Sequence, residues 1–260
     1  MKKYAGYMID LDGTIYRGKE KIPAAKRFIE RLQEHDIPFL FVTNNSTQAP
    51  IKVVENLANN FDIHVKEENV YTSALATADY IADLDKDKRS VYVIGEVGLK
   101  QAILDKGFRF EETNPDYVVV GLDYDVTYHK FELATLAIKR GAKFIGTNAD
   151  TNLPNERGLV PGAGSVIALV ECSTQQKATY IGKPETIIME KALERLGLPK
   201  DEVVMVGDNY MTDIKAGINF GIDTMLVYTG VSTRELVRKQ EIAPTIELGS
   251  LDEWKVCSCC

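Results

Sequence analysis

The sequence predicts an α/β protein with a doubly wound, Rossmann-like parallel sheet and a second α/β domain inserted within it. Apolar runs of strand length alternate with helical patterns, which favours a parallel sheet covered by helices. Clusters of polar residues directly follow several of these runs, as expected where parallel strands end and ligands bind. A long middle segment carries strands and helices of its own, which indicates the inserted domain.

Strand and helix signals alternate at both ends of the chain. Residues 4–9 form an apolar run, and a helical pattern follows over residues 23–35. Residues 39–42 form a second apolar run, and residues 50–59 restore the helical pattern. The C-terminal part repeats the alternation, with strands expected at residues 203–206 and 224–227 and a helix at about 211–219.

The middle segment has enough apolar pattern to bury a core of its own. We expect residues 1–80 and 181–260 to form one domain and residues 81–180 to form the inserted domain. The strands of this inserted domain are expected at residues 91–94, 117–120 and 143–146, and its helices near residues 98–105 and 130–139.

Length and composition disfavour several classes of protein. The chain has 260 residues, and no apolar stretch approaches the roughly 18 residues that suggest a membrane span. Its start lacks the pattern of a signal peptide, so we expect a cytoplasmic protein. A formal net charge of -7 disfavours nucleic acid or an anionic membrane surface as the partner. Three of the four cysteines crowd the last four residues, which is no disulfide framework.

Two acidic pairs are expected at the carboxyl edge of the sheet. Asp10 and Asp12 follow the first strand, and Asp208 and Asp213 follow the strand at residues 203–206. Converging carboxylates without balancing arginines repel one another unless a hard cation lies among them, and Mg²⁺ prefers oxygen ligands. The acidic residues therefore imply Mg²⁺.

A hydroxyl, an amide and a cation accompany these acids. Thr43 and Asn44 follow the second strand, and Lys183 lies in a Gly-Lys-Pro sequence. With magnesium, these groups would supply positive charge and hydrogen bonds to the oxygens of a phosphoryl group. Taken singly, each cluster is more typical of a turn, a helix cap or a surface charge. Their occurrence together, in order and at strand ends, favours a site.

Four short segments contain these polar residues: Asp10-Leu11-Asp12-Gly13-Thr14, Thr43-Asn44-Asn45, Gly182-Lys183-Pro184 and the stretch from Gly207 to Ile214. They resemble the four motifs of the haloacid dehalogenase (HAD) superfamily. The Thr-Asn-Asn form of the second motif and the long insertion after it resemble the NagD-like subfamily, which includes acid-sugar, nitrophenyl and pyridoxal-phosphate phosphatases. The resemblance covers nearly the whole chain.

The resemblance implies a role for each of these residues. Asp10 would be the nucleophile and a metal ligand, and Asp12 would be the general acid and base and a ligand through its backbone carbonyl. Asp208 would be a further ligand of Mg²⁺. Of the others, Thr43 and Asn44 would bind the phosphoryl group, Lys183 would neutralise it, Asp213 would orient Lys183 or metal-bound water, and Asn209 would support them.

These roles predict a magnesium-dependent phosphatase that hydrolyses small phosphate monoesters, sugar or acid-sugar phosphates among them, through an aspartyl phosphate on Asp10. A sugar-phosphate mutase or phosphotransferase is the alternative on the same scaffold, because an aspartyl phosphate can pass to a second hydroxyl. A non-catalytic phospho-ligand sensor is the alternative from another class.

Loops of the inserted domain could face the leaving group. Their polar side chains could as easily cap strands and helices. The expected partner is a small phosphorylated metabolite, and the inserted domain adds a surface on which a homo-oligomer could form. The loops span residues 121–127 and 146–155, and their candidate substrate residues are Tyr124, Asn148, Asp150 and Asn152.

Overall fold

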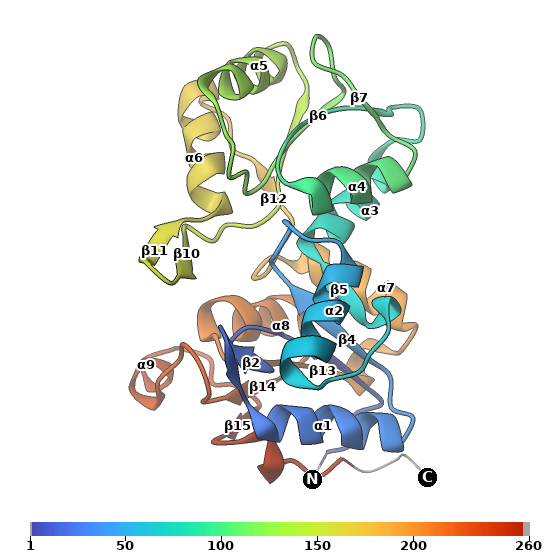
Figure 1. Ribbon diagram of the computed structural model, residues 1–260, viewed down its shortest axis with the longest axis vertical. Coiled ribbons are helices and arrows are strands. Elements are labelled where there is room, and N and C mark those ends of the chain that lie inside the picture. The colour runs from blue at the N-terminus through green and yellow to red at the C-terminus, as the bar shows by residue number, and fades with distance from the viewer. Residues whose placement is uncertain (1, 257–260) are drawn as a thin grey trace. The chain divides into compact units, whose positions relative to one another are not determined.

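The computed structural model describes residues 2–256, which form two compact units (Figure 1). The three cysteines of the C-terminal tail lie outside the described residues. Within residues 2–256, no helix is both long and apolar enough to cross a lipid bilayer. Of the described residues, the first unit draws on 2–43, 50–71 and 183–256, and the second on 44–49 and 72–182.

Residues 72–80 belong to the second unit, although the sequence pattern predicts them in the first domain. The reason is a helix at Ser73–Leu84 (α3), which packs against the helix at Val97–Asp105 (α4). The buried side chains of α3 are mostly Ser, Ala and Thr, so this helix carries little apolar periodicity to mark it in the sequence.

A six-stranded sheet forms the centre of the first unit. Its strands are β1 (Gly6–Ile9), β4 (Phe39–Thr43), β5 (Val70–Thr72), β13 (Val203–Gly207), β14 (Asp223–Val227) and β15 (Ile246–Leu248). The strand order is β15-β14-β13-β1-β4-β5, and neighbouring strands from β15 to β4 run parallel. Because β1 lies between β13 and β4, the carboxyl ends of these three strands meet at one edge.

Helices cover both faces of this sheet. All residues of β1 and β4 are buried, so both strands read as continuous apolar runs, as is typical of parallel sheets with two covered faces. One face packs against α1 (Pro23–Glu34), α2 (Pro50–Phe61) and residues 251–256, and the other against α7 (Thr186–Leu196) and α8 (Lys215–Phe220). Smaller elements are the hairpin β2 (Tyr16–Arg17) and β3 (Glu20–Lys21), and α9 (Arg234–Arg238).

The second unit has a five-stranded parallel sheet of its own. Its strands are β6 (Ser90–Ile94), β7 (Arg109–Phe110), β8 (Tyr117–Val120), β9 (Lys143–Gly146) and β12 (Thr179–Tyr180), in the order β12-β9-β8-β6-β7. One face packs against α5 (Tyr128–Lys139) and α6 (Ala163–Thr174), and α3 and α4 lie together on the other side (Figure 1). A hairpin of β10 (Asn152–Asn155) and β11 (Gly158–Pro161) precedes α6.

The predicted α/β architecture of parallel sheets flanked by helices is confirmed, and one expected element differs. The helix expected at residues 211–219 is a π-helical turn at Tyr210–Ile214 followed by α8. Asn209 caps the turn, because its Oδ1 accepts a hydrogen bond from the backbone N–H of Met211 at 3.0 Å. Asp213 therefore lies in a wide turn next to the end of β13 rather than in a regular helix.

Candidate active site

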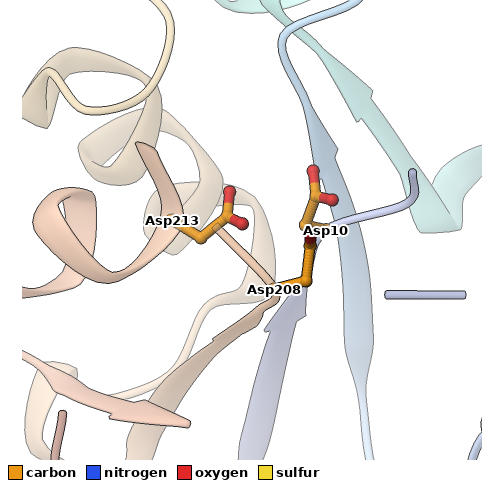
Figure 2. A group of neighbouring side chains, drawn as sticks. All are labelled: Asp10, Asp208 and Asp213. Carbon is orange, nitrogen blue, oxygen red and sulfur yellow. The ribbon is translucent and has the colours of Figure 1, made fainter. Parts of the chain in front are cut away.

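Three aspartates converge at the carboxyl edge of the first unit's sheet (Figure 2). Asp10 follows β1, Asp208 follows the neighbouring strand β13, and Asp213 lies on the turn after β13. One carboxylate oxygen of each lies within 4.8 Å of those of the other two. Parallel pairing of β1 with β13 thus brings together residues that lie at opposite ends of the chain.

The ammonium of Lys183 lies among these acids and is almost fully buried. Its Nζ lies 2.6 Å from Oδ1 of Asp10 and 2.8 Å from Oδ1 of Asp213, and it donates to the carbonyl of Val42 at 2.7 Å. Val42 precedes Thr43, the buried last residue of β4. The segments that contain Asp10, Thr43, Lys183 and Asp213 therefore meet at one place.

Negative charge exceeds positive charge in this cluster, because three carboxylates face one ammonium. Burial raises the pKa of Asp10 well above its ordinary value, and the charge of Asp213 adds to this effect while Lys183 opposes it. Burial and the charge of Asp213 also raise the pKa of Asp208 to about 7. Burial alone would lower the pKa of Lys183, but Asp10 and Asp213 outweigh it and hold that pKa above its ordinary value.

Asp12 lies in a different environment from Asp10. It sits on a tight turn after β1, in which Gly13 has a φ of 91°, a conformation that favours glycine. The side chain of Asp12 is exposed, and its Oδ1 accepts a hydrogen bond from the backbone N–H of Gly18 at 3.0 Å. The first acidic pair therefore consists of one largely buried carboxylate and one that faces solvent.

The loop of residues 229–231, which the sequence analysis did not single out, contacts Asp208 and the turn after Asp10. The backbone N–H of Val231 donates to Oδ2 of Asp208 at 2.6 Å, and Oγ1 of Thr14 donates to its Oδ1 at 3.3 Å. The hydroxyl of Thr229 donates to the carbonyl of Gly13 at 2.6 Å. The loop therefore fixes both the Asp208 carboxylate and the turn that follows Asp10.

Two glycines make room for the same carboxylate. A Cβ atom at Gly13 or at Gly230 would overlap atoms of Asp208. Gly230 does not have the positive φ that Gly13 has, so the space taken by Asp208 is what requires a glycine there. Local sequence patterns give little signal for the contacts of this loop with Asp208, because these come from a backbone N–H and from the absence of a side chain at Gly230.

Asn44 and the candidate residues of the inserted domain lie in the second unit. Nδ2 of Asn44 donates to Oδ2 of Asp150 at 2.7 Å, and Nδ2 of Asn148 donates to the same oxygen at 2.6 Å. Tyr124 is 69% exposed, and Asn152 is exposed at the start of the β10–β11 hairpin. The structure thus joins Asn148 and Asp150 to Asn44, while Tyr124 and Asn152 lie on the surface.

The donor set fits a hard divalent cation. Asp10, Asp208 and Asp213 offer only carboxylate oxygens, and magnesium and calcium prefer such ligands. With all three carboxylates ionised, the cluster would carry three negative charges against the one positive charge of Lys183, and a divalent cation would neutralise this excess. Burial and the neighbouring charge of Asp213 raise the pKa values of both Asp10 and Asp208, and a bound cation would oppose this effect.

Family models match both ends of the chain. A model described as haloacid dehalogenase-like hydrolase matches residues 7–109, and one described as HAD-hydrolase-like matches residues 180–254. The first match contains Asp10, Asp12 and Thr43, and the second contains Lys183 and Asp208. Together the two matches therefore cover the segments that form the cluster.

Relatives agree over nearly the whole length. The 5'-nucleotidase YutF of Bacillus subtilis is 52% identical over 254 residues, covering 98% of each chain. An acid sugar phosphatase of Staphylococcus epidermidis is 52% identical over 253 residues, covering 97% of each chain. A solved structure, a double mutant of a thermostable NPPase from Geobacillus stearothermophilus, has a TM-score of 0.92 and 53% identity over 98% of this chain and 99% of that one. The chain therefore belongs to the NagD-like subfamily of the haloacid dehalogenase superfamily and is a phosphoric monoester hydrolase.

Proposed function

We propose that this protein is a Mg²⁺-dependent phosphatase that hydrolyses small phosphate monoesters through an aspartyl phosphate on Asp10. The observation that carries the proposal is the position of the buried Lys183 ammonium. Its Nζ lies 2.6 Å from Oδ1 of Asp10, which follows the central strand β1. This cation orients the carboxylate and supplies positive charge where the oxygens of a transferring phosphoryl group would gather.

In the first half of the reaction, a carboxylate oxygen of Asp10 attacks phosphorus. The bond from phosphorus to the ester oxygen breaks as the bond to Asp10 forms, and the leaving alkoxide takes a proton from the carboxylic acid of Asp12. The position of Asp12 supports this role, because its side chain is accessible and it lies two residues from Asp10 on a tight turn. Lys183, Thr43 and Asn44 bind the phosphoryl oxygens.

In the second half, water replaces Asp10 on phosphorus. Asp12, now a carboxylate, takes a proton from the water molecule as the water oxygen attacks. The bond between phosphorus and Asp10 breaks, which releases inorganic phosphate and restores the Asp10 carboxylate. Asp12 ends the cycle with its proton regained, so the residues return to their starting state.

Asp10, Asp208 and the backbone carbonyl of Asp12 would hold Mg²⁺, which when bound supplies positive charge to the phosphoryl oxygens. Asp213 accepts the backbone N–H of Asn209 at 3.0 Å and lies 2.8 Å from Lys183. It therefore orients the ammonium toward Asp10.

Sugar or acid-sugar phosphates are the substrates that we propose. The relatives carry the names of an acid sugar phosphatase, a 5'-nucleotidase and a p-nitrophenylphosphatase. Their named substrates share the phosphoryl group and differ in the leaving group, which supports a site that binds the phosphoryl group and admits several small leaving groups. We propose that the reaction takes place in the cytoplasm.

A phosphate-release assay tests the role of the metal. With nitrophenyl phosphate or a sugar phosphate, turnover should require added Mg²⁺ and cease in a chelator. Calcium should bind and inhibit, because its larger and more flexible oxygen shell does not impose the octahedral geometry of magnesium. Undiminished turnover in the chelator would contradict the proposal.

Mass spectrometry tests the nucleophile. Asp10→Asn should abolish turnover with the fold intact, because an amide is uncharged and a poor nucleophile. Asp12→Asn should still form the aspartyl phosphate from nitrophenyl phosphate, whose leaving group needs little protonation, and should then hydrolyse it slowly. A trapped phosphoryl adduct on Asp12→Asn that is absent from the double variant Asp10→Asn, Asp12→Asn is the expected result. An adduct on the double variant would place the nucleophile elsewhere.

A further inference from the structure

One carboxylate of the second unit holds two side-chain amides at once. Oδ2 of Asp150 accepts a hydrogen bond from Nδ2 of Asn44 at 2.7 Å and from Nδ2 of Asn148 at 2.6 Å. Oδ1 of Asn148 accepts one from the hydroxyl of Thr147 at 2.8 Å. Thr147 is fully buried and Asn148 is 6% exposed. These four residues, Asn44, Thr147, Asn148 and Asp150, are termed the amide clasp below.

The amide clasp reaches two points at which the chain passes from one unit to the other. Asn44 directly follows Thr43, and Gly182 directly precedes Lys183. The backbone N–H of Gly182 donates to the carbonyl of Thr147 at 2.8 Å. A Cβ atom at position 182 would come within 2.6 Å of Oδ1 of Asn44, so the glycine lets the two segments pack closely. One loop, which follows β9, therefore contacts the chain next to both Thr43 and Lys183.

The backbone around Asn44 is held as well. The buried hydroxyl of Ser73 donates to the carbonyl of Asn44 at 2.6 Å. The carbonyl of Thr47 accepts the backbone N–H of Gly98 at 3.0 Å. The segment Asn44–Ala49 is thus anchored on the second unit at several places, and Asp150 supplies a charged anchor. Hydrogen bonds to an ionised acceptor are roughly twice as strong as neutral ones.

We propose that Asp150 is a positioning residue for phosphate binding, which acts by fixing Asn44 through the amide clasp. The proposal rests on the proposed function, in which Thr43 and Asn44 bind the phosphoryl group. It differs from the expectation that Asn148 and Asp150 contact the leaving group, because their polar atoms bond to Asn44 and to each other. A residue that positions the phosphoryl-binding segment affects all substrates alike, whereas one that contacts the leaving group affects them unequally.

The experiment compares Asp150→Asn with the wild type in Mg²⁺. The variant keeps the shape of the side chain and removes its charge, so both amide donors lose their ionised acceptor. The inhibition constant of inorganic phosphate should rise about tenfold, the loss expected from weakening one charge-assisted hydrogen bond. The kcat/KM values for nitrophenyl phosphate and for glucose 6-phosphate should fall by the same factor, within about twofold of each other.

Asp116→Asn is the matched control. Oδ2 of Asp116 also accepts two hydrogen bonds, from the backbone N–H of Ser90 at 3.0 Å and from its hydroxyl at 2.6 Å. Asp116 lies at the amino end of β8, whereas Asp150 follows the carboxyl end of the parallel strand β9. The two residues therefore lie at opposite ends of the strands. Asp116→Asn should lower the melting temperature, yet leave the phosphate inhibition constant and both kcat/KM values within about twofold of wild type.

The outcomes distinguish three roles for Asp150: positioning of Asn44, contact with the leaving group, and support of the fold alone. An unchanged phosphate inhibition constant in Asp150→Asn would overturn the positioning role, whatever happens to the melting temperature. A loss confined to glucose 6-phosphate would assign Asp150 to the leaving group instead. If Asp150→Asn does not fold, Asp150→Glu, which keeps the charge and displaces the oxygens, is measured in the same way and with the same two criteria.

Failure of the proposed function gives a different result. In that case the wild-type protein itself releases no phosphate from either substrate. Binding of inorganic phosphate, measured by calorimetry with Mg²⁺ present, then replaces the inhibition constant. Equal affinity in wild type and in Asp150→Asn would overturn the positioning role, and an affinity about tenfold weaker in the variant would support it.

Discussion

Buried carboxylates have different surroundings in the two units. In the second unit, Asp123 lies 2.9 Å from the ammonium of Lys130, and Glu171 lies 2.7 Å from that of Lys177. In the first unit, three carboxylates lie together, two of them, Asp10 and Asp213, pair with the single ammonium of Lys183, and burial raises the pKa of Asp10 and Asp208. The second unit therefore balances these charges with its own side chains, whereas the first leaves negative charge for a bound cation to balance.

This difference separates ion pairs that support the fold from a site that binds a ligand. A buried carboxylate with one matched cation has no net charge left for a bound ion to balance. A cluster of unmatched carboxylates costs stability, and such strongly perturbed groups are typical of functional sites. Removing a lysine should therefore affect mainly turnover in the first unit and mainly stability in the second.

The largest effect is expected from Lys183→Met. Methionine has a similar length and no charge, so the variant removes the positive charge beside Asp10. Turnover of nitrophenyl phosphate in saturating Mg²⁺ should fall about 100- to 1,000-fold, the cost of losing one group that stabilises charge in a transition state. Steady-state kinetics measure this fall directly.

Lys130→Met is the matched change in the second unit. It leaves the carboxylate of Asp123, which is 5% exposed, without its cation. We expect a stability loss of about 1–3 kcal/mol, seen as a lower melting temperature, with turnover within about twofold of wild type. The comparison of the two units breaks down if Lys130→Met loses turnover as strongly as Lys183→Met.

A smaller effect is expected from Gly230→Ala, which pushes a methyl group against Asp208. The affinity for Mg²⁺, measured by calorimetry on the metal-free protein, should fall about tenfold, the lower end of what displaced supporting groups cost a metal site. Gly249→Ala is the control, because the nearest atom to its new methyl group is Oε1 of Glu253 at 2.9 Å, the end of a flexible side chain. Equal Mg²⁺ affinity in the two variants would show that Gly230 does not shape the metal site.

The smallest effect is expected in the pH dependence of stability that Asp116 of the second unit contributes. Burial alone would raise the pKa of Asp116, but hydrogen bonds from the hydroxyl and backbone N–H of Ser90 outweigh it and hold that pKa below its ordinary value. A pKa lowered by folding stabilises the protein above the unfolded pKa of about 3.9, and this contribution disappears as pH falls through the folded value.

The melting temperatures of wild type and Asp116→Asn test this. The variant lacks the ionisable group, so the difference between the two proteins should be largest near neutral pH and should shrink as pH falls below about 4. Active-site carboxylates are present in both proteins, so most of their contribution cancels in the comparison. A difference that grows in acid would contradict the assigned direction of the Asp116 pKa.

The sequence was sufficient to predict the main strands of both sheets and the residues of the central cluster, but not the edge strands β5, β7, β12 and β15. β1, β4 and β13 are buried on both faces, so they appear as apolar runs, and Asp10, Thr43 and Asp208 stand where these runs end. Parallel pairing then places those ends side by side. Because this argument needs only strand order and direction, it works without any knowledge of side-chain contacts.

Other features could not be predicted from local patterns. The helix α3 buries small side chains and lacks an apolar stripe. Gly230 is needed because a side chain there would overlap Asp208, and no local sequence pattern indicates such a requirement. The bond between Asn44 and Asp150 joins residues 106 positions apart. Polar residues are common at strand ends, so only the packing of the two loops identifies these as partners.

The surroundings of Lys183 also limit which residues can replace it. Three oxygens, from Asp10, Asp213 and Val42, lie 2.6–2.8 Å from its Nζ. The three N–H bonds of an ammonium diverge and can each meet one of these acceptors, whereas the donors of a guanidinium lie in one plane. Arginine often replaces lysine on protein surfaces at little cost. At position 183 the same exchange would keep the charge but could not satisfy all three acceptors. We therefore expect arginine not to be tolerated at this position.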